Sequence, residues 1–185
     1  MAHSRGARRP ARAGAGRGEA PQARPARTAA AGRGQLHLWL RNQAGRAGVP
    51  LRPTFQRWLL AIPALRRRRA EVNILIVDAH AARRYNREFR GRDYATNVLS
   101  FPYEPLPGEA SRLLGDLVIC APVVAREARE QGKRPRDHWA HLAIHGVLHL
   151  LGHDHEDAAQ AEAMEALERR ILAGLGIADP YRTAR

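Results

Sequence analysis

One internal segment, residues 139–151, constrains the fold more than any other part of the chain. It reads WAHLAIHGVLHLL and is apolar nearly all round, which is typical of a helix buried inside a protein core. It nevertheless carries His141, His145 and His149 at successive i+4 positions, which lie on one face of such a helix. Each buried polar group left without a partner costs about 1–3 kcal/mol. A core helix with three histidines therefore predicts a binding site in the middle of the fold.

The spacing of the histidines suits a metal ion. His145 and His149 lie one helical turn apart, Gly152 can end the helix in a left-handed conformation, and the returning chain can bring His155 to the same ion. Three neutral imidazoles suit Zn²⁺ and leave a fourth position for water, as in catalytic sites. The alternative is a set of core histidines with satisfied hydrogen bonds, which the number and spacing of the histidines disfavour. His141 is expected to support the ligands or to pack beside them.

The same spacing matches the HExxHxxGxxH frame of the metzincin proteases in all but one position. Gly146 stands where those proteases place the glutamate that deprotonates the zinc-bound water. The motif thus predicts a metal hydrolase but argues against ordinary zinc proteolysis. A glycine inside a helix also costs roughly 1 kcal/mol relative to alanine, so a specific contact should require it.

The charge of the chain indicates a polyanionic partner. The 185 residues carry a formal net charge of +13, with a pI near 11.4. Residues 1–34 contain eight arginines and one glutamate, which leaves +6 for residues 35–185. The folded part is therefore basic by itself, which favours nucleic acid or an anionic surface.

Two segments are predicted from composition. Residues 1–34 consist mainly of Ala, Gly, Arg and Pro without Val, Ile, Leu or aromatic residues, so we expect a disordered extension. An organelle transit peptide is a minor alternative. Residues 35–185 form one α+β domain. No apolar run reaches the length of a membrane span, the start lacks a secretory signal, and Cys120 is the only cysteine, so a cytoplasmic location is predicted.

The periodicity from residue 35 predicts four strands and about five helices. The strands are expected at 35–40, 72–77, 97–101 and 114–120. The helices are expected around 55–62, 78–91, 122–131, 137–151 and 158–175. The second strand-to-helix junction offers Asp78 as an N-cap, with Tyr85 and Phe89 facing inward and Gly91 as the stop. Asp137 is a possible cap for the histidine helix, and the arginines at 66–69 are expected in a solvated loop.

Three blocks of the sequence together resemble the signature of the YbeY family. They are HGVLHLLGHDH at 145–155, FRGRDYATNVLSFP at 89–102 and LGDLVIC at 114–120. The resemblance covers about residues 35–181. It implies an α+β fold with a mixed four-stranded sheet beside about five helices and a zincin-like metal helix. It also implies a metal-dependent, single-strand-specific endoribonuclease in ribosomal RNA processing, namely maturation of the 3′ end of 16S rRNA, and in ribosome quality control.

The resemblance also implies roles for particular residues. The family's three zinc-binding histidines fall on His145, His149 and His155, which implies one Zn²⁺ ion. Its functionally important arginine falls on Arg90, which we expect to bind the scissile phosphate; the flanking tyrosine and lysine of the family pattern are Phe89 and Arg92 here. From the residues alone, an arginine that complements the dipole at a helix end is the simpler interpretation of Arg90. The expected partners are RNA, especially small-subunit ribosomal RNA, and small-subunit proteins, with no membrane and no DNA specificity.

Other functions remain possible from the sequence. The favoured reading is a zinc endoribonuclease in which either the zinc-bound water or the RNA 2′-hydroxyl attacks. A ribosome-assembly factor with a structural metal is the second, and a zincin-type peptidase is the third. Asp93, Thr96 and Ser100 either line the cleft or satisfy backbone groups, and Asp116 is expected to pair within the fold near the site.

Overall fold

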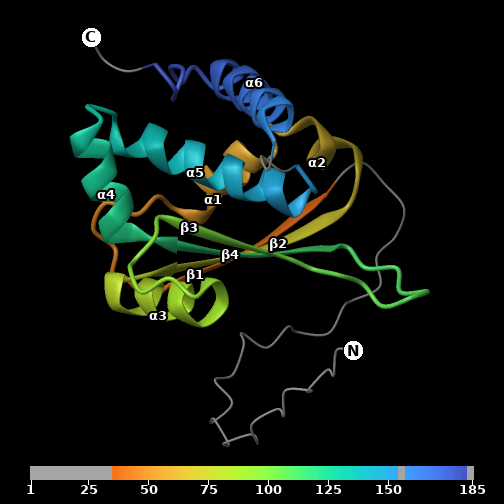
Figure 1. Ribbon diagram of the computed structural model, residues 1–185. Helices are drawn as coiled ribbons and strands as arrows, with labels where there is room; N and C mark the ends of the chain where they lie inside the picture. Colours follow the sequence, from red (N-terminus) through yellow and green to blue (C-terminus); the bar gives the residue numbers. More distant parts are fainter. Residues whose placement is uncertain (1–34, 154–156, 183–185) are drawn as a thin grey trace, which may run out of the picture. The chain divides into compact units, whose positions relative to one another are not determined.

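Four strands form one mixed sheet. The computed structural model of the chain describes residues 35–153 and 157–182; the predicted N-terminal extension, residues 1–34, lies outside them. The strands are β1 (Leu36–Asn42), β2 (Ala70–Val77), β3 (Val98–Pro102) and β4 (Leu113–Cys120). Their spatial order is β1-β2-β4-β3, in which β1, β2 and β4 are parallel and β3 runs antiparallel to β4 (Figure 1). The predicted mixed α+β sheet is confirmed, with β3 as one edge strand and β1 as the other.

Six helices belong to the described ranges, one more than expected. They are α1 (Arg52–Leu59), α2 (Pro63–Arg67), α3 (Ala79–Arg90), α4 (Ala121–Glu130), α5 (Pro135–Leu150) and α6 (Ala158–Gly174). The additional helix is α2, because Pro63 occupies the first turn of a new helix as well as limiting the one before it. Arg66 and Arg67 are therefore helical, and the expectation of a loop was wrong for them, whereas Arg68 and Arg69 lie in the connection to β2. No helix of these ranges is long and apolar enough to cross a membrane.

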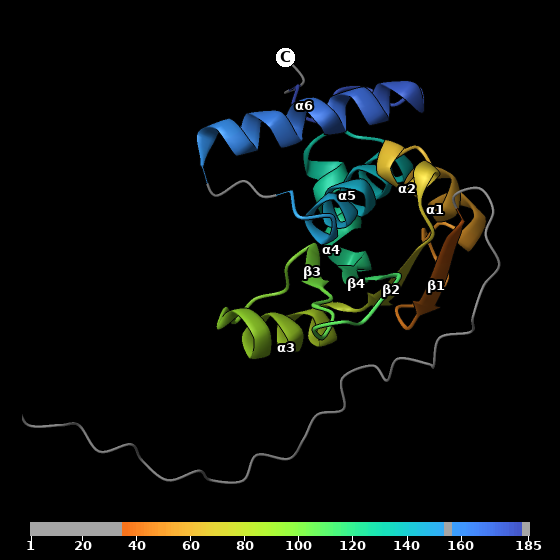
Figure 2. The ribbon, with the colours of Figure 1, turned by 90° about the vertical axis from the view of Figure 1, so that its right-hand side faces the viewer.

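The histidine helix α5 is enclosed from several sides. It packs on β3 and β4 of the sheet and contacts α1 and α6, whereas α3 covers the opposite face of the sheet (Figures 1 and 2). The main core cluster combines α5 with side chains of α1, α6 and the three parallel strands. Burial on several sides explains why α5 is apolar nearly all round rather than along one stripe.

The helix ends are mostly those that the sequence predicts. The Asp78 carboxylate accepts a hydrogen bond from the Ala81 amide at 2.8 Å, and Gly91 ends α3 with φ 66°. The predicted cap at Asp137 was wrong. α5 begins at Pro135, whose fixed φ favours the first helical position, so Asp137 lies within the first turn and complements the helix dipole there.

At Gly146, α5 lies close against the sheet. A Cβ atom at this position would lie 2.9 Å from Leu117 Cδ2 and 3.3 Å from Ser100 Oγ. Leu117 is fully buried in β4, so its side chain has little room to move. This contact is the specific reason for a glycine inside the helix. It also leaves no room at this position for the glutamate side chain of the metzincin frame.

Gly146→Ala is expected to lower the free energy of unfolding by about 1 kcal/mol. Overpacking costs roughly 1–3 kcal/mol, and the gain in helix propensity of about 1 kcal/mol offsets part of it. Urea denaturation measures the change. Gly174→Ala is the matched control, because a Cβ there meets nothing within 4 Å and should leave stability unchanged or raise it. Equal stabilisation by both substitutions would contradict the packing argument.

Candidate metal centre

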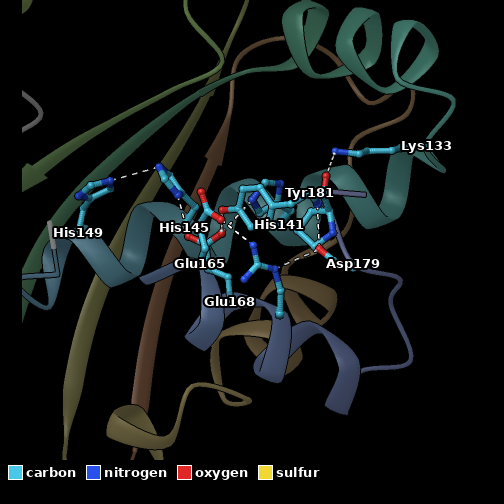
Figure 3. Close-up of polar contacts among 10 residues, drawn as sticks. Lys133, His141, His145, His149, Glu165, Glu168, Asp179 and Tyr181 are labelled. Atoms are coloured by element: carbon cyan, nitrogen blue, oxygen red, sulfur yellow. Dashed lines mark hydrogen bonds and ion pairs between the residues drawn. The ribbon is translucent and has the colours of Figure 1, made fainter. Parts of the chain in front are cut away.

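Three histidines of α5 form a half-buried row. His141, His145 and His149 follow one another at single-turn intervals, with ring centroids 6.1 Å apart for the first pair and 4.7 Å for the second (Figure 3). Gly152, with φ 87°, follows the helix in the left-handed conformation that the sequence predicts. His155, the third predicted ligand, lies outside the described residues. The row therefore places two of the three predicted ligands side by side.

The Nε2 atoms of His145 and His149 lie 3.2 Å apart. Two nitrogen ligands at about 2.05 Å from a tetrahedral zinc ion lie roughly 3.3 Å apart, so the observed separation fits a shared ion. The two rings are inclined at 80°. The pair can thus present two nitrogen atoms to one metal without rearrangement of the helix.

Glu168 of α6 forms hydrogen bonds with two histidines of the row. This carboxylate is fully buried; Oε1 contacts His145 Nδ1 at 2.8 Å and Oε2 contacts His141 Nε2 at 3.0 Å. The Tyr181 hydroxyl donates a further hydrogen bond to Oε2. Burial opposes ionisation of Glu168, but the three hydrogen bonds outweigh it and lower the pKa to about 2. Glu168 is therefore an anion at neutral pH.

The charge of Glu168 determines which nitrogen of His145 carries the proton. An ionised carboxylate can only accept, so Nδ1 of His145 must donate to it. His145 Nε2 then carries the lone pair, and this is the atom that faces His149. A carboxylate behind a histidine is the usual outer partner of a metal ligand, because it fixes the tautomer and raises the basicity of the ring.

The described residues offer a second set of metal ligands. Ligand atoms of His141, His145 and Glu168 all lie within 4.8 Å of one another. This set uses the same His145 as the predicted site, but its carboxylate already accepts hydrogen bonds from both rings. Either set could hold an ion, and each makes a different prediction for His149.

The C-terminal segment packs beside α6 and Glu168. The Arg169 guanidinium lies 5.0 Å above the Tyr181 ring, and its Nη2 pairs with Glu165 at 2.6 Å. Lys133 Nζ donates to the Pro180 carbonyl at 2.6 Å (Figure 3). Burial and the neighbouring Glu168 carboxylate raise the pKa of Tyr181, so it remains a hydrogen-bond donor.

The roles of Glu168 and Tyr181 were not predicted from the sequence. A signal for Glu168 exists, since Met164 and Ile171 place it on the buried side of α6. A charged residue on an apolar stripe requires a partner, but its identity follows only from the packing of α6 on α5. Tyr181 gives no comparable signal.

Arg90 is the last residue of α3, and its side chain contacts the edge strand β3. Its Nη2 donates to the Ser100 carbonyl at 3.2 Å, and Ser100 Oγ donates to the Gly146 carbonyl at 3.3 Å. Two hydrogen bonds, both made by Ser100, therefore link Arg90 to Gly146, the residue next to His145. Ser100 satisfies a backbone group of the metal helix, one of the two roles left open for it.

Two predicted polar residues lie away from the histidines. Asp93 pairs with Arg83 at 2.6 Å on the surface of α3. Asp116 accepts a hydrogen bond from Asn73 at 2.7 Å, so the expected pairing within the fold is found. Asp116 alternates along β4 with Leu117, which contacts α5, so it faces the opposite side of the sheet. The expectation that Asp116 lies near the site was wrong.

Comparison with known proteins identifies a family and several relatives that this chain resembles. The family model "Endoribonuclease YbeY" matches residues 49–176. Endoribonuclease YbeY of Alkalilimnicola ehrlichii is 63% identical over 143 residues, which cover 75% of this chain and 86% of the relative. The protein of the same name from Stenotrophomonas maltophilia is 60% identical over 144 residues, 76% of this chain and 89% of the relative.

A solved structure shares the fold. The solution structure of TM1509 from Thermotoga maritima matches with a TM-score of 0.50 and 25% sequence identity, covering 80% of this chain and 99% of that chain. The family model spans more than half of the chain, and the curated relatives exceed half identity over most of it. The chain therefore belongs to the YbeY endoribonuclease family.

Proposed function

We propose that the chain is a metal-dependent endoribonuclease that cleaves single-stranded RNA. In the cell we expect it to mature the 3′ end of 16S ribosomal RNA in the cytoplasm and to act in ribosome quality control, in contact with small-subunit proteins. The observation that carries the proposal is the facing pair His145 and His149, held by a buried carboxylate, with Arg90 linked to the same helix through Ser100. Relatives named as endoribonucleases support the choice of substrate.

The proposed metal is one Zn²⁺ bound by His145, His149 and His155. Imidazole nitrogen is a preferred zinc ligand, and the separation of the two described nitrogen atoms fits a shared ion. Zinc bound there would supply Lewis acidity and would lower the pKa of a coordinated water to about 7. We favour this set over His141, His145 and Glu168, because Glu168 already accepts hydrogen bonds from both of those rings and from Tyr181.

Glu168 and Arg90 have separate roles in the proposed reaction. Glu168 keeps the proton of His145 on Nδ1 and so orients the ring. Arg90 donates one of its five N–H groups to the Ser100 carbonyl, and the other four can donate to a phosphate. Cleavage of a phosphodiester increases the negative charge on its non-bridging oxygens, which a guanidinium close to the metal helix stabilises.

Proteolysis is a poorer fit to the same centre. The metzincin mechanism needs a carboxylate after the first histidine of the motif, and Gly146 stands there. The contacts with Leu117 and Ser100 exclude a longer side chain at that position. The test is cleavage of single-stranded RNA, of the same RNA in a duplex and of casein, each with and without a chelator. Chelator-sensitive cleavage of the single strand alone supports the proposal, and cleavage of casein contradicts it.

Arg90→Glu is expected to reduce RNA cleavage at least about 100-fold while the zinc content stays unchanged. The substitution replaces a phosphate-binding cation with a repelling anion, and loss of one stabilising donor alone costs roughly 100- to 1,000-fold in other hydrolases. Cleavage rates and elemental analysis measure the two quantities. Arg41→Glu on β1, at the far edge of the sheet, is the matched charge reversal. Equal activity of the two variants would show that Arg90 is misassigned.

A further inference from the structure

An aromatic patch lies on the surface of the sheet edge nearest the metal helix. It comprises Tyr85 and Phe89 of α3 and Phe101 of β3. Phe89 was expected to face inward, but its side chain is 49% exposed. Tyr85 and Phe101 are partly exposed beside it. An exposed phenyl group supported by two further rings is unusual enough to require a reason.

The rings of the aromatic patch support one another. Phe89 lies almost parallel to Tyr85, at 6.2 Å and 18°, and meets Phe101 edge-on at 5.0 Å and 69°. The Arg84 guanidinium lies 5.4 Å above the Tyr85 ring. Contacts on two sides restrict the orientation of Phe89. A ring held in this way offers a planar apolar surface at a low cost in side-chain entropy.

The patch and the candidate metal centre are linked through the edge strand β3. Phe101 directly follows Ser100, whose hydroxyl is bonded to the Gly146 carbonyl of α5. Ser100 faces α5, and Phe101 packs with the α3 side of the sheet. Because β3 is the edge strand, a chain that passes over this edge can meet both faces. A strand that runs from the histidines across this edge would pass the aromatic patch.

The charges around the patch favour a polyanion. Arg90 follows Phe89 directly, and its guanidinium donates a hydrogen bond to a neutral carbonyl, that of Ser100. Within the described part of α3, by contrast, Arg83 and Arg87 pair with Asp93. The Asp116 carboxylate lies opposite Phe101 in the strand register and would repel a phosphate. A bound strand should therefore place its phosphates on the Arg90 side and a base against the rings.

We propose that Phe89, supported by Tyr85 and Phe101, is a base-stacking subsite for single-stranded RNA. The inference rests on the proposed function and adds a recognition element to it. Aromatic side chains bind single strands because any base can stack on them, whereas the bases of a duplex already stack on each other. The aromatic patch thus supplies a physical basis for preferring single strands, while Arg90 supplies charge without sequence preference.

The test is the affinity of the full-length protein for a short 2′-O-methyl RNA, measured by fluorescence anisotropy with the oligonucleotide checked for integrity afterwards. Phe89→Leu is expected to weaken binding of the single strand about tenfold, within the range for loss of one stacked base. Phe89→Tyr should bind as the wild type does. Trp39→Leu is the matched control, because Trp39 is an exposed aromatic residue on the opposite edge strand. Affinity for the duplex should not change in any variant.

An abasic scan of the same oligonucleotide provides a test that does not depend on one variant. At one position, removal of the base should weaken binding to the wild type about tenfold but have no further effect on Phe89→Leu, as in a double-mutant cycle. Unchanged affinity of Phe89→Leu, as expected if the patch docks a protein instead, would overturn the inference. Equal loss for single strand and duplex would overturn it too. Cleavage by the wild type is scored separately, so failure of the subsite and failure of the nuclease assignment remain distinguishable.

Discussion

His149→Ala is expected to abolish metal-dependent RNA cleavage, with a loss of at least about 100-fold, and to reduce bound zinc below one ion per chain. Even removal of an outer partner of a metal ligand typically costs roughly 10- to 100-fold in metal affinity or activity. His149 contributes one of the two facing Nε2 atoms, so its loss removes a ligand itself. Elemental analysis and cleavage of ribosomal precursor RNA, with and without a chelator, measure the result.

Two matched variants make this experiment decisive. His80→Ala removes an exposed histidine of α3 and should change neither quantity. His141→Asn separates the two ligand sets, because His141 belongs to the set with Glu168 but not to the proposed one. We expect His141→Asn to retain zinc. If His149→Ala keeps a full zinc ion and its activity while His141→Asn loses the ion, the ligand assignment is wrong.

Glu168→Gln is expected to weaken zinc binding by roughly 10- to 100-fold and to lower the free energy of unfolding of the metal-free protein by about 2–3 kcal/mol. The weaker zinc binding follows from the loss of the anion that fixes the His145 tautomer. The lower stability follows because an amide cannot accept from His141, His145 and Tyr181 as a carboxylate does. Competition with a chromophoric chelator and urea denaturation measure the two effects separately.

Glu165→Gln is the control on the same helix. Its carboxylate pairs with Arg169 at a position where both side chains are more than a third exposed, so its loss should cost less than about 1 kcal/mol. Tyr181→Phe removes one of the three donors to Glu168 and should give an intermediate effect of about 1 kcal/mol. Zinc affinity that is the same in Glu168→Gln and Glu165→Gln would show that Glu168 serves stability alone.

Much of the fold could be predicted because local patterns agree with it. The alternation and length of apolar runs placed β2 and β4 to within a few residues, and Asp78 and Gly91 act locally as cap and stop. The first turn of α5 was misplaced, since Pro135 and Asp137 both favour a helix start and only one position can begin the helix. Phe89 was misplaced because it lies in the last turn of α3, where it contacts Phe101 of the edge strand but remains 49% exposed.

The sequence by itself determined the histidine helix, the i+4 spacing of His145 and His149, and the need for a glycine at 146, because these follow from helix periodicity and residue chemistry. Tertiary structure alone decided that the Glu168 carboxylate and the Tyr181 hydroxyl lie behind the histidines and that Arg90 reaches Ser100. These contacts join residues 10 to 27 positions apart in the chain. No local pattern specifies such pairs, because they arise only when α6 packs on α5 and α3 packs beneath the sheet.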